Sequence, residues 1–88
     1  MMMELSQTEL APIFILEPKS DSEVASALQK LKERNTVVLN LAYLKPSQAR
    51  QAADMMAGCS CAIDGKAVWI GKQTYVYTPN NVDLNLNN

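Results

Sequence analysis

Short apolar runs alternate with helix-like segments along the chain. The run Ile13–Leu16 stands between Pro12 and Pro18, which predicts a short strand bounded by residues that interrupt regular structure. A second run, 36–41, is β-branched or apolar at nearly every position. That pattern is typical of a strand in the middle of a covered sheet, because both of its faces must then be apolar.

Two segments have the period of a helix. Ser20 and Glu23 have the spacing of a capping box, in which each residue satisfies a free amide of the first turn. The apolar positions that follow recur at helical spacing: Val24, Ala27, Leu28 and Leu31. A second helix is expected to begin at Pro46, to continue through Met56 and to end at Gly58 as a left-handed cap. The succession of strand, helix and strand predicts a right-handed βαβ unit.

Three further strands are expected after the second helix, over 59–63, 67–70 and 74–78. Asp64-Gly65 is a strong hairpin signal between the first two of these strands, and Pro79 ends the last. The predicted order is therefore β-α-β-α-β-β-β. It describes a compact α/β two-layer sandwich, in which a mixed five-stranded sheet carries two helices on one face.

The globular domain is expected over residues 12–82, between tails at 1–11 and 83–88. Two helices cover only one face of such a sheet. Because the first two strands are apolar on both faces, the uncovered face would expose an apolar patch larger than soluble monomers usually tolerate. We therefore expect a homodimer with twofold symmetry.

Three aromatic residues lie close together in the last two strands, and the loop between the strands decides which of them share a face. A two-residue loop places Val68 opposite Tyr75. A three-residue loop instead places Trp69 there, and it brings Ala67 opposite Tyr77. These aromatic side chains are either part of the core or anchors of a binding surface, where aromatic residues are enriched.

Composition limits the classes of function that the chain is expected to have. The chain has 88 residues and a net charge of -1, so one small domain is expected and nucleic acid is not an expected partner. It has no histidine, and its three glycines form no phosphate-binding loop, so neither an enzyme nor a cofactor site is predicted. Cys59 and Cys61 lie two apart on a predicted strand, which turns their side chains to opposite faces. We expect free thiols, as in a reducing cytoplasm, and no metal site.

Four segments carry a resemblance to a known family. In chain order they read LEPKS, VVLNL, PSQARQAADMMAG and AIDGKAVWIGKQTYVYTP. Their order and spacing from Ile15 to Val82 resemble the SepF family of cell-division proteins. The resemblance implies a non-enzymatic dimeric adaptor, in some members assembled into rings or filaments, that binds the C-terminal tail of FtsZ. It also implies a cytoplasmic location at the division septum.

Family members carry an N-terminal amphipathic membrane helix before a linker and this domain. Residues 1–11 lack the basic polar face that such a helix requires, so no membrane binding is expected of this chain by itself. The residues alone also leave a rival open, a dimeric small-molecule-sensing regulatory domain. Gly-rich ligand loops would favour that rival.

The resemblance also assigns the FtsZ-peptide site. Tyr75 matches the aromatic position that lines the peptide pocket, and Tyr77 is expected to join it. Trp69 stands where many members carry Arg or Lys, and Trp cannot form their ion pair with an acidic peptide. Lys72 or Lys66 is the candidate replacement cation.

Self-association is assigned to the second helix. Gly58 matches a helix-ending glycine that the family associates with self-association, and Ala53 and Met56 are its expected neighbours. Met55 stands where the family usually has Phe, which is a tolerable exchange in a core.

Overall fold

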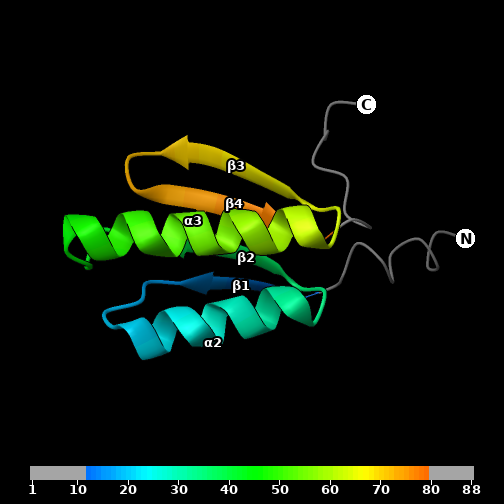
Figure 1. The fold of residues 1–88 in the computed structure, drawn as a ribbon, viewed down its shortest axis with the longest axis horizontal. Coiled ribbons are helices and arrows are strands. Elements are labelled where there is room, and N and C mark those ends of the chain that lie inside the picture. The colour runs from blue at the N-terminus through cyan, green and yellow to red at the C-terminus, as the bar shows by residue number, and fades with distance from the viewer. Residues whose placement is uncertain (1–11, 80–88) are drawn as a thin grey trace, which may run out of the picture.

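The computed structural model describes residues 12–79, so the predicted tails at 1–11 and 83–88 and the expected end of the domain at 80–82 lie outside the described residues. Within 12–79 the elements follow one another as β1 (Ile13–Leu16), α2 (Asp21–Lys32), β2 (Thr36–Asn40), α3 (Pro46–Ala62), β3 (Lys66–Gly71) and β4 (Thr74–Thr78). Both helices lie side by side on the same side of the sheet (Figure 1), which confirms the predicted two-layer α/β arrangement.

The described sheet has four strands in the order β1-β2-β4-β3. β1 and β2 are parallel, as expected for a strand–helix–strand unit, and β4 runs antiparallel to both of its neighbours. β1 and β3 are therefore the two edges of the described sheet. The core lies between the sheet and the helices, where side chains of both helices meet Val37, Leu39 and Tyr77.

The start of α2 follows the predicted capping pattern. Ser20 has an extended backbone, and its hydroxyl accepts a hydrogen bond from the Glu23 amide at 3.3 Å. The Glu23 carboxylate in turn accepts from the Lys19 amide at 2.8 Å. The Ser20 half of the predicted capping box is therefore present, whereas the Glu23 carboxylate bonds the amide of Lys19, one residue before the N-cap. Together the two bonds fix the start of the helix next to the end of β1.

The predicted strand at 59–63 is wrong, because α3 continues through these residues to Ala62. The helix buries one stripe of small or flexible side chains at spacings of three and four residues: Ala49, Ala52, Met56 and Ser60. Ser60 extends this stripe and donates its hydroxyl proton to the Met56 carbonyl at 3.0 Å. Gly58 therefore lies in the interior of the helix and is not its cap, and the described sheet has four strands where five were expected.

The Asp64-Gly65 turn joins a helix to a strand and forms no hairpin. Ile63 is the C-cap of α3, and Asp64 has the left-handed φ of 59° that ends many helices. A Cβ atom at Gly65 would overlap the carbonyl oxygen of Thr78. Gly65 is thus required by the close approach of this turn to the end of β4.

Both cysteines are free and lie on α3, where Cys59 is half-buried and Cys61 is exposed. Residues that are two apart in a helix are separated by about 200° around its axis. The two cysteine side chains therefore diverge because of the helix, and not because they alternate along a strand as predicted.

Candidate functional site

The pairing of β3 and β4 decides which aromatic side chains share a face. Trp69 lies opposite Tyr75 and Ala67 opposite Tyr77, as the three-residue loop predicted. Only Lys72 and Gln73 separate the strands, however, and a register shift between Trp69 and Gly71 supplies the extra residue. A β-bulge in the strand has therefore taken the place of a longer loop.

The aromatic side chains lie on the face that the helices cover, because Tyr75 and Tyr77 pair with the core residues Leu39 and Val37. Their exposure increases toward the sheet edge. Tyr77 is 1% exposed, Tyr75 is half-buried, and Trp69 on the edge strand β3 is 64% exposed. The two tyrosine rings stack with their centroids 5.9 Å apart and their planes 23° apart.

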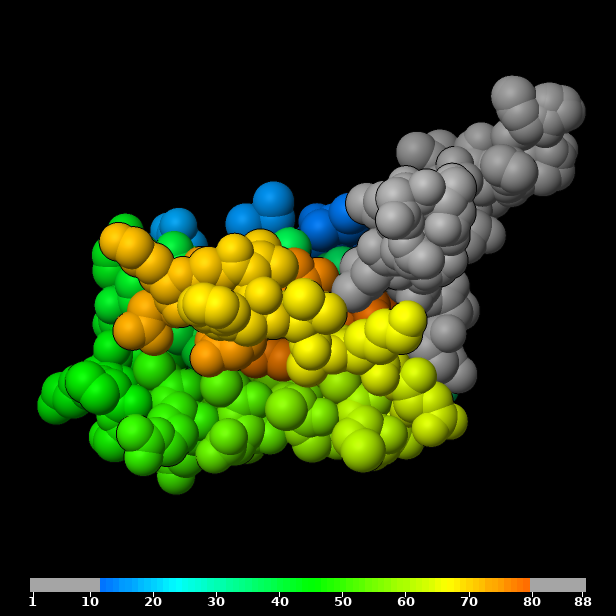
Figure 2. Space-filling view, turned by 90° about the horizontal axis from the view of Figure 1, so that it is seen from above, coloured from blue at the N-terminus to red at the C-terminus, as the bar shows by residue number. Residues whose placement is uncertain are grey.

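The exposed indole of Trp69 is held by the β3–β4 turn. Its Nε1–H donates a hydrogen bond to the backbone carbonyl of Lys72 at 2.9 Å. Lys72 is exposed and adjacent to the indole, whereas Lys66 lies at the other end of β3, opposite Thr78. Of the two candidate cations, Lys72 is therefore the one beside Trp69. In Figure 2, β3 (yellow) lies outermost at this edge, with α3 (green) below it.

Tyr77 belongs to the core and is closed to a partner. Its hydroxyl is buried without a hydrogen-bond partner among the described residues. Burial, reinforced by the neighbouring Tyr75 and Asp54, raises the pKa of Tyr77 well above the ordinary tyrosine value. The residue can support Tyr75 from beneath, but it has no surface to offer a peptide.

The structure separates the residues that were predicted for self-association. Gly58 is exposed, and a Cβ atom there would meet nothing within 4 Å. Ala53 is half-buried against the core, and Met56 is completely buried inside the protomer. Met55, three residues before Gly58 and so on the same helix face, is 47% exposed. The sequence alone had treated Met55 only as a core exchange.

The sheet face opposite the helices carries an apolar row that crosses all four described strands. Ile15 pairs with Val38, Val38 with Val76, and Val76 with Val68. We call these four residues the open-face row. Ile15 is 73% exposed and Val68 39%. The sequence pointed to an apolar face through its first two strands, but it did not reveal that β3 and β4 extend the row.

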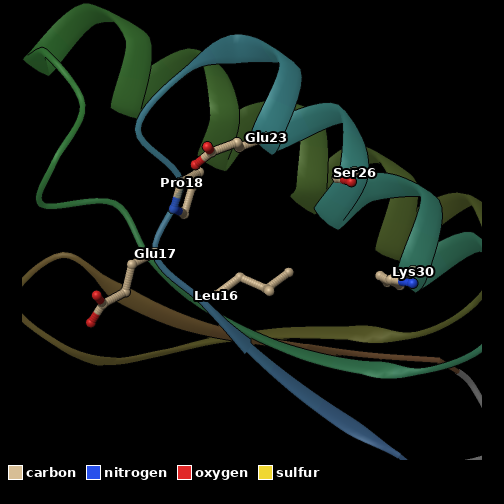
Figure 3. A pocket seen from close by; sticks show the side chains of 6 residues that line it. All are labelled: Leu16, Glu17, Pro18, Glu23, Ser26 and Lys30. Atoms are coloured by element: carbon tan, nitrogen blue, oxygen red, sulfur yellow. The ribbon is translucent and has the colours of Figure 1, made fainter.

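Two shallow hollows accompany these surfaces. One, of about 200 Å³, lies between β1 and α2 and is drawn in Figure 3. The other, of about 230 Å³, lies between α2 and α3, beside Met55. Both are smaller than the roughly 300–1,000 Å³ of most small-molecule sites. Residues 12–79 contain no cluster of metal-binding side chains and no helix long and apolar enough to span a membrane.

Comparison with known proteins identifies the family. The sequence model of the family described as Cell division protein SepF matches residues 13–84. The chain belongs to the SepF family. It is 41% identical over 72 residues to the cell division protein SepF of Synechococcus elongatus, with 82% of this chain and 38% of the relative covered. It is 40% identical over 77 residues to the SepF of Prochlorococcus marinus strain SARG, with 88% and 41% covered.

Solved structures support the same fold. A SepF-like protein from Archaeoglobus fulgidus superposes with a TM-score of 0.72 at 19% identity, covering 86% of this chain and 94% of that chain. A SepF-like protein from Pyrococcus furiosus gives 0.73 at 18% identity, covering 85% and 94%. The chain spans about two fifths of the length of the curated SepF relatives it matches. Membership of SepF supports a role in cell division, and it is not membership of a known enzyme family.

Proposed function

We propose that this domain acts in septum formation as a non-catalytic adaptor, which holds the C-terminal tail of FtsZ and associates with further copies of itself. The observation that carries the proposal is the graded aromatic edge of β3 and β4. Trp69 on the edge strand β3 is mostly exposed and lies opposite the half-buried Tyr75 of β4, on the same face of the sheet, and these two residues form the aromatic edge.

The aromatic edge has the properties of a peptide-binding surface. Trp69 and Tyr75 offer large apolar areas with few rotatable bonds, and Trp and Tyr dominate the binding energy of many interfaces. The hydrogen bond from the indole to Lys72 fixes Trp69 in advance, which lowers the entropy lost on binding. Lys72 supplies a cation for an acidic tail. An extended tail can lie across the two aromatic rings, whereas addition of a strand to β3 is disfavoured by the bulge between Trp69 and Gly71.

Self-association is assigned to the open-face row. The row presents four β-branched side chains in direct register, and no charged residue interrupts it. Covering it with the same row of a second copy removes apolar surface from water on both sides, which is the main favourable term in association. A single copy of this small domain has no further described helix with which to cover that face.

The peptide site is tested by titration with a synthetic C-terminal FtsZ peptide. Trp69 is the only tryptophan of the chain, so its fluorescence emission reports the site directly and should shift to shorter wavelength as water leaves the indole. We expect Tyr75→Ala to weaken binding by about tenfold or more, as for a typical interface anchor. Tyr43→Ala is the matched control, since Tyr43 is 58% exposed and lies beside Lys19.

Unchanged affinity of the Tyr75→Ala variant, with an unchanged melting temperature, would exclude the aromatic edge. Self-association is tested separately by sedimentation. Val76→Glu places a charge in the middle of the open-face row and should shift the protein to monomers, whereas Gln51→Glu on the helix layer should not. Nothing described between residues 12 and 79 favours the small-molecule-sensing alternative, because both hollows are small and shallow.

A further inference from the structure

The outer edge of β1 is regular, apolar and unpaired within the described part of the chain. Its four residues are Ile-Phe-Ile-Leu, without a charge, a proline or a bulge. The other edge, β3, carries a bulge, and bulges blunt an edge against pairing. A flat apolar edge strand invites pairing, since its outward amides and carbonyls have no protein partner. β1 is thus the better prepared of the two edges for another strand.

A charged groove runs beside this edge. α2 packs mainly against β2 and covers β1 only in part. Phe14 and Leu16 on β1 therefore remain half-buried. The hollow of about 200 Å³ above Leu16 has opposite charges along its length, with Glu23 at one end and Lys30 at the other (Figure 3). The Lys30 ammonium lies 4.8 Å from the centre of the Phe14 ring, which places the cation at the beginning of β1.

We propose that the β1 edges of two copies pair antiparallel about a twofold axis, which joins two four-stranded sheets into one of eight strands. In an antiparallel pair, directly opposite side chains share a face. Phe14 and Leu16 both point toward the helices, so Phe14 of one copy lies opposite Leu16 of the second. Ile15 then lies at the axis, opposite Ile15 of the second copy. It is the most exposed of the large hydrophobic side chains described, at 73%.

The charges favour a second copy as the occupant. Antiparallel pairing reverses the direction of the groove, so Lys30 of each copy comes to the end that holds Glu23 of the other. The same twofold axis generates two such pairs, and this surface complements itself without any other partner. The two α2 helices, which lie above β2, would be about 14 Å apart, or three strand spacings. That distance leaves room for the Lys30 and Glu23 side chains between them.

Pro12 and Pro18 limit the pairing to a few residues, so this contact is weak alone and works between copies that already associate. The inference therefore rests on the proposed self-association, but it uses the backbone edge of β1 and the groove beside it, and it shares only Ile15 with the open-face row. The open-face row lies on one side of the sheet, whereas the groove and its charges lie at the edge on the helix side.

Cysteine cross-linking tests the register in the full chain with Cys59→Ala and Cys61→Ala. Under mild oxidation Ile15→Cys should form disulfide-linked dimers, because the two positions face each other at the axis. Ile13→Cys is the matched control on the same strand and face. In this register the two Ile13 positions are about 13 Å apart along the strands, beyond the roughly 7 Å that a disulfide can span. Equal cross-linking of the two variants would overturn the proposal.

A change of charge distinguishes association through the β1 edge from association through the open-face row. Lys30→Glu should lower the yield of Ile15→Cys dimers roughly threefold or more, since it turns two attractions into repulsions. Adding Glu23→Lys should restore the yield. An unaffected yield with Lys30→Glu would reject the edge contact, and so would protection of Ile15→Cys from a thiol reagent by the FtsZ peptide. Val76→Cys reports the open face independently, so its cross-linking shows whether self-association itself has failed.

Discussion

Replacing Tyr77 by phenylalanine removes a single oxygen atom from the core. The Tyr77 ring is packed between the sheet and the helices and stacks on Tyr75, and Phe retains that ring. The hydroxyl is the part that does not fit, because it is buried without a hydrogen-bond partner among the described residues. Tyr77→Phe therefore separates the contribution of the ring from the cost of the hydroxyl.

A buried polar group without a partner costs about 1–3 kcal/mol relative to the hydrated group. Removing the oxygen relieves this cost, but it also leaves a small void, and the void offsets part of the stabilisation. We expect Tyr77→Phe to raise the free energy of unfolding by about 1 kcal/mol. For a domain of this size that corresponds to a rise of about 4–8 °C in melting temperature.

The same burial predicts a loss of stability in alkali. The pKa of Tyr77 is raised in the folded protein, whereas in the unfolded chain it is near the ordinary value of about 10. Below pH 10 both states keep the proton, so ionisation of this group adds no pH-dependent penalty to the folded state. Above pH 10 the unfolded chain releases the proton first, so stability falls as the pH rises. Tyr77→Phe should remove this part of the alkaline decline.

Thermal unfolding followed by circular dichroism, at pH 7 and at steps from pH 9 to pH 11, measures both effects. Tyr75→Phe is the matched control, because the Tyr75 ring stacks on Tyr77 but is only half-buried. It should change the melting temperature little. If Tyr77→Phe lowered stability by 1 kcal/mol or more at pH 7, the hydroxyl would have to make a bond, and the reasoning from its isolation would be refuted.

Three further predictions concern stability and assembly. Gly58→Ala should stabilise the fold by about 0.5–1 kcal/mol in chemical denaturation, since Gly58 occupies an exposed position inside α3 with space for a Cβ atom. Gly58→Lys tests self-association through α3, and it should lower the sedimentation coefficient if a second copy contacts that face. Gly65→Ala should cost about 2 kcal/mol or more by the same method, because the new Cβ atom would overlap the Thr78 carbonyl oxygen. Ser20→Ala removes the N-cap of α2 and should cost about 1 kcal/mol, and an unchanged denaturation midpoint would mean that the cap is dispensable.

The elements with strong local signals could be predicted from the sequence. Ser20 caps α2 as its spacing with Glu23 indicated, and β1 and β2 form the expected parallel pair. The end of α3 was mispredicted because Gly58 looked like a cap and 59–63 looked like a strand. Ser60 lies four residues after Met56 and is buried on the same stripe of α3, so this spacing was the feature that indicated a longer helix. A polar residue on that stripe weakens an apolar pattern, although its hydroxyl is satisfied by the helix itself.

The sequence selected the residue types of the candidate peptide site but did not indicate their geometry. Trp69, Tyr75 and Lys72 were selected from the sequence, and Trp69 and Lys72 meet through a hydrogen bond that no sequence pattern indicates. Tyr77 was selected with them, but its neighbour Val37 and the helices bury it. The register followed from a bulge, and a bulge depends on how the whole sheet twists and not only on the turn residues.

The surfaces proposed for binding lie on different parts of the sheet, and this separation has a structural consequence. The aromatic edge faces the helix side at β3, the open-face row lies on the opposite side, and the edge proposed to pair is β1. Only Ile15 belongs to both the open-face row and the β1 contact, so occupying one surface leaves most of the others accessible. Two distinct twofold contacts on one protomer generate an open-ended assembly unless the geometry closes it. Such an assembly would present many peptide sites in a row, so weak binding of individual FtsZ tails would add up to firm attachment of a filament.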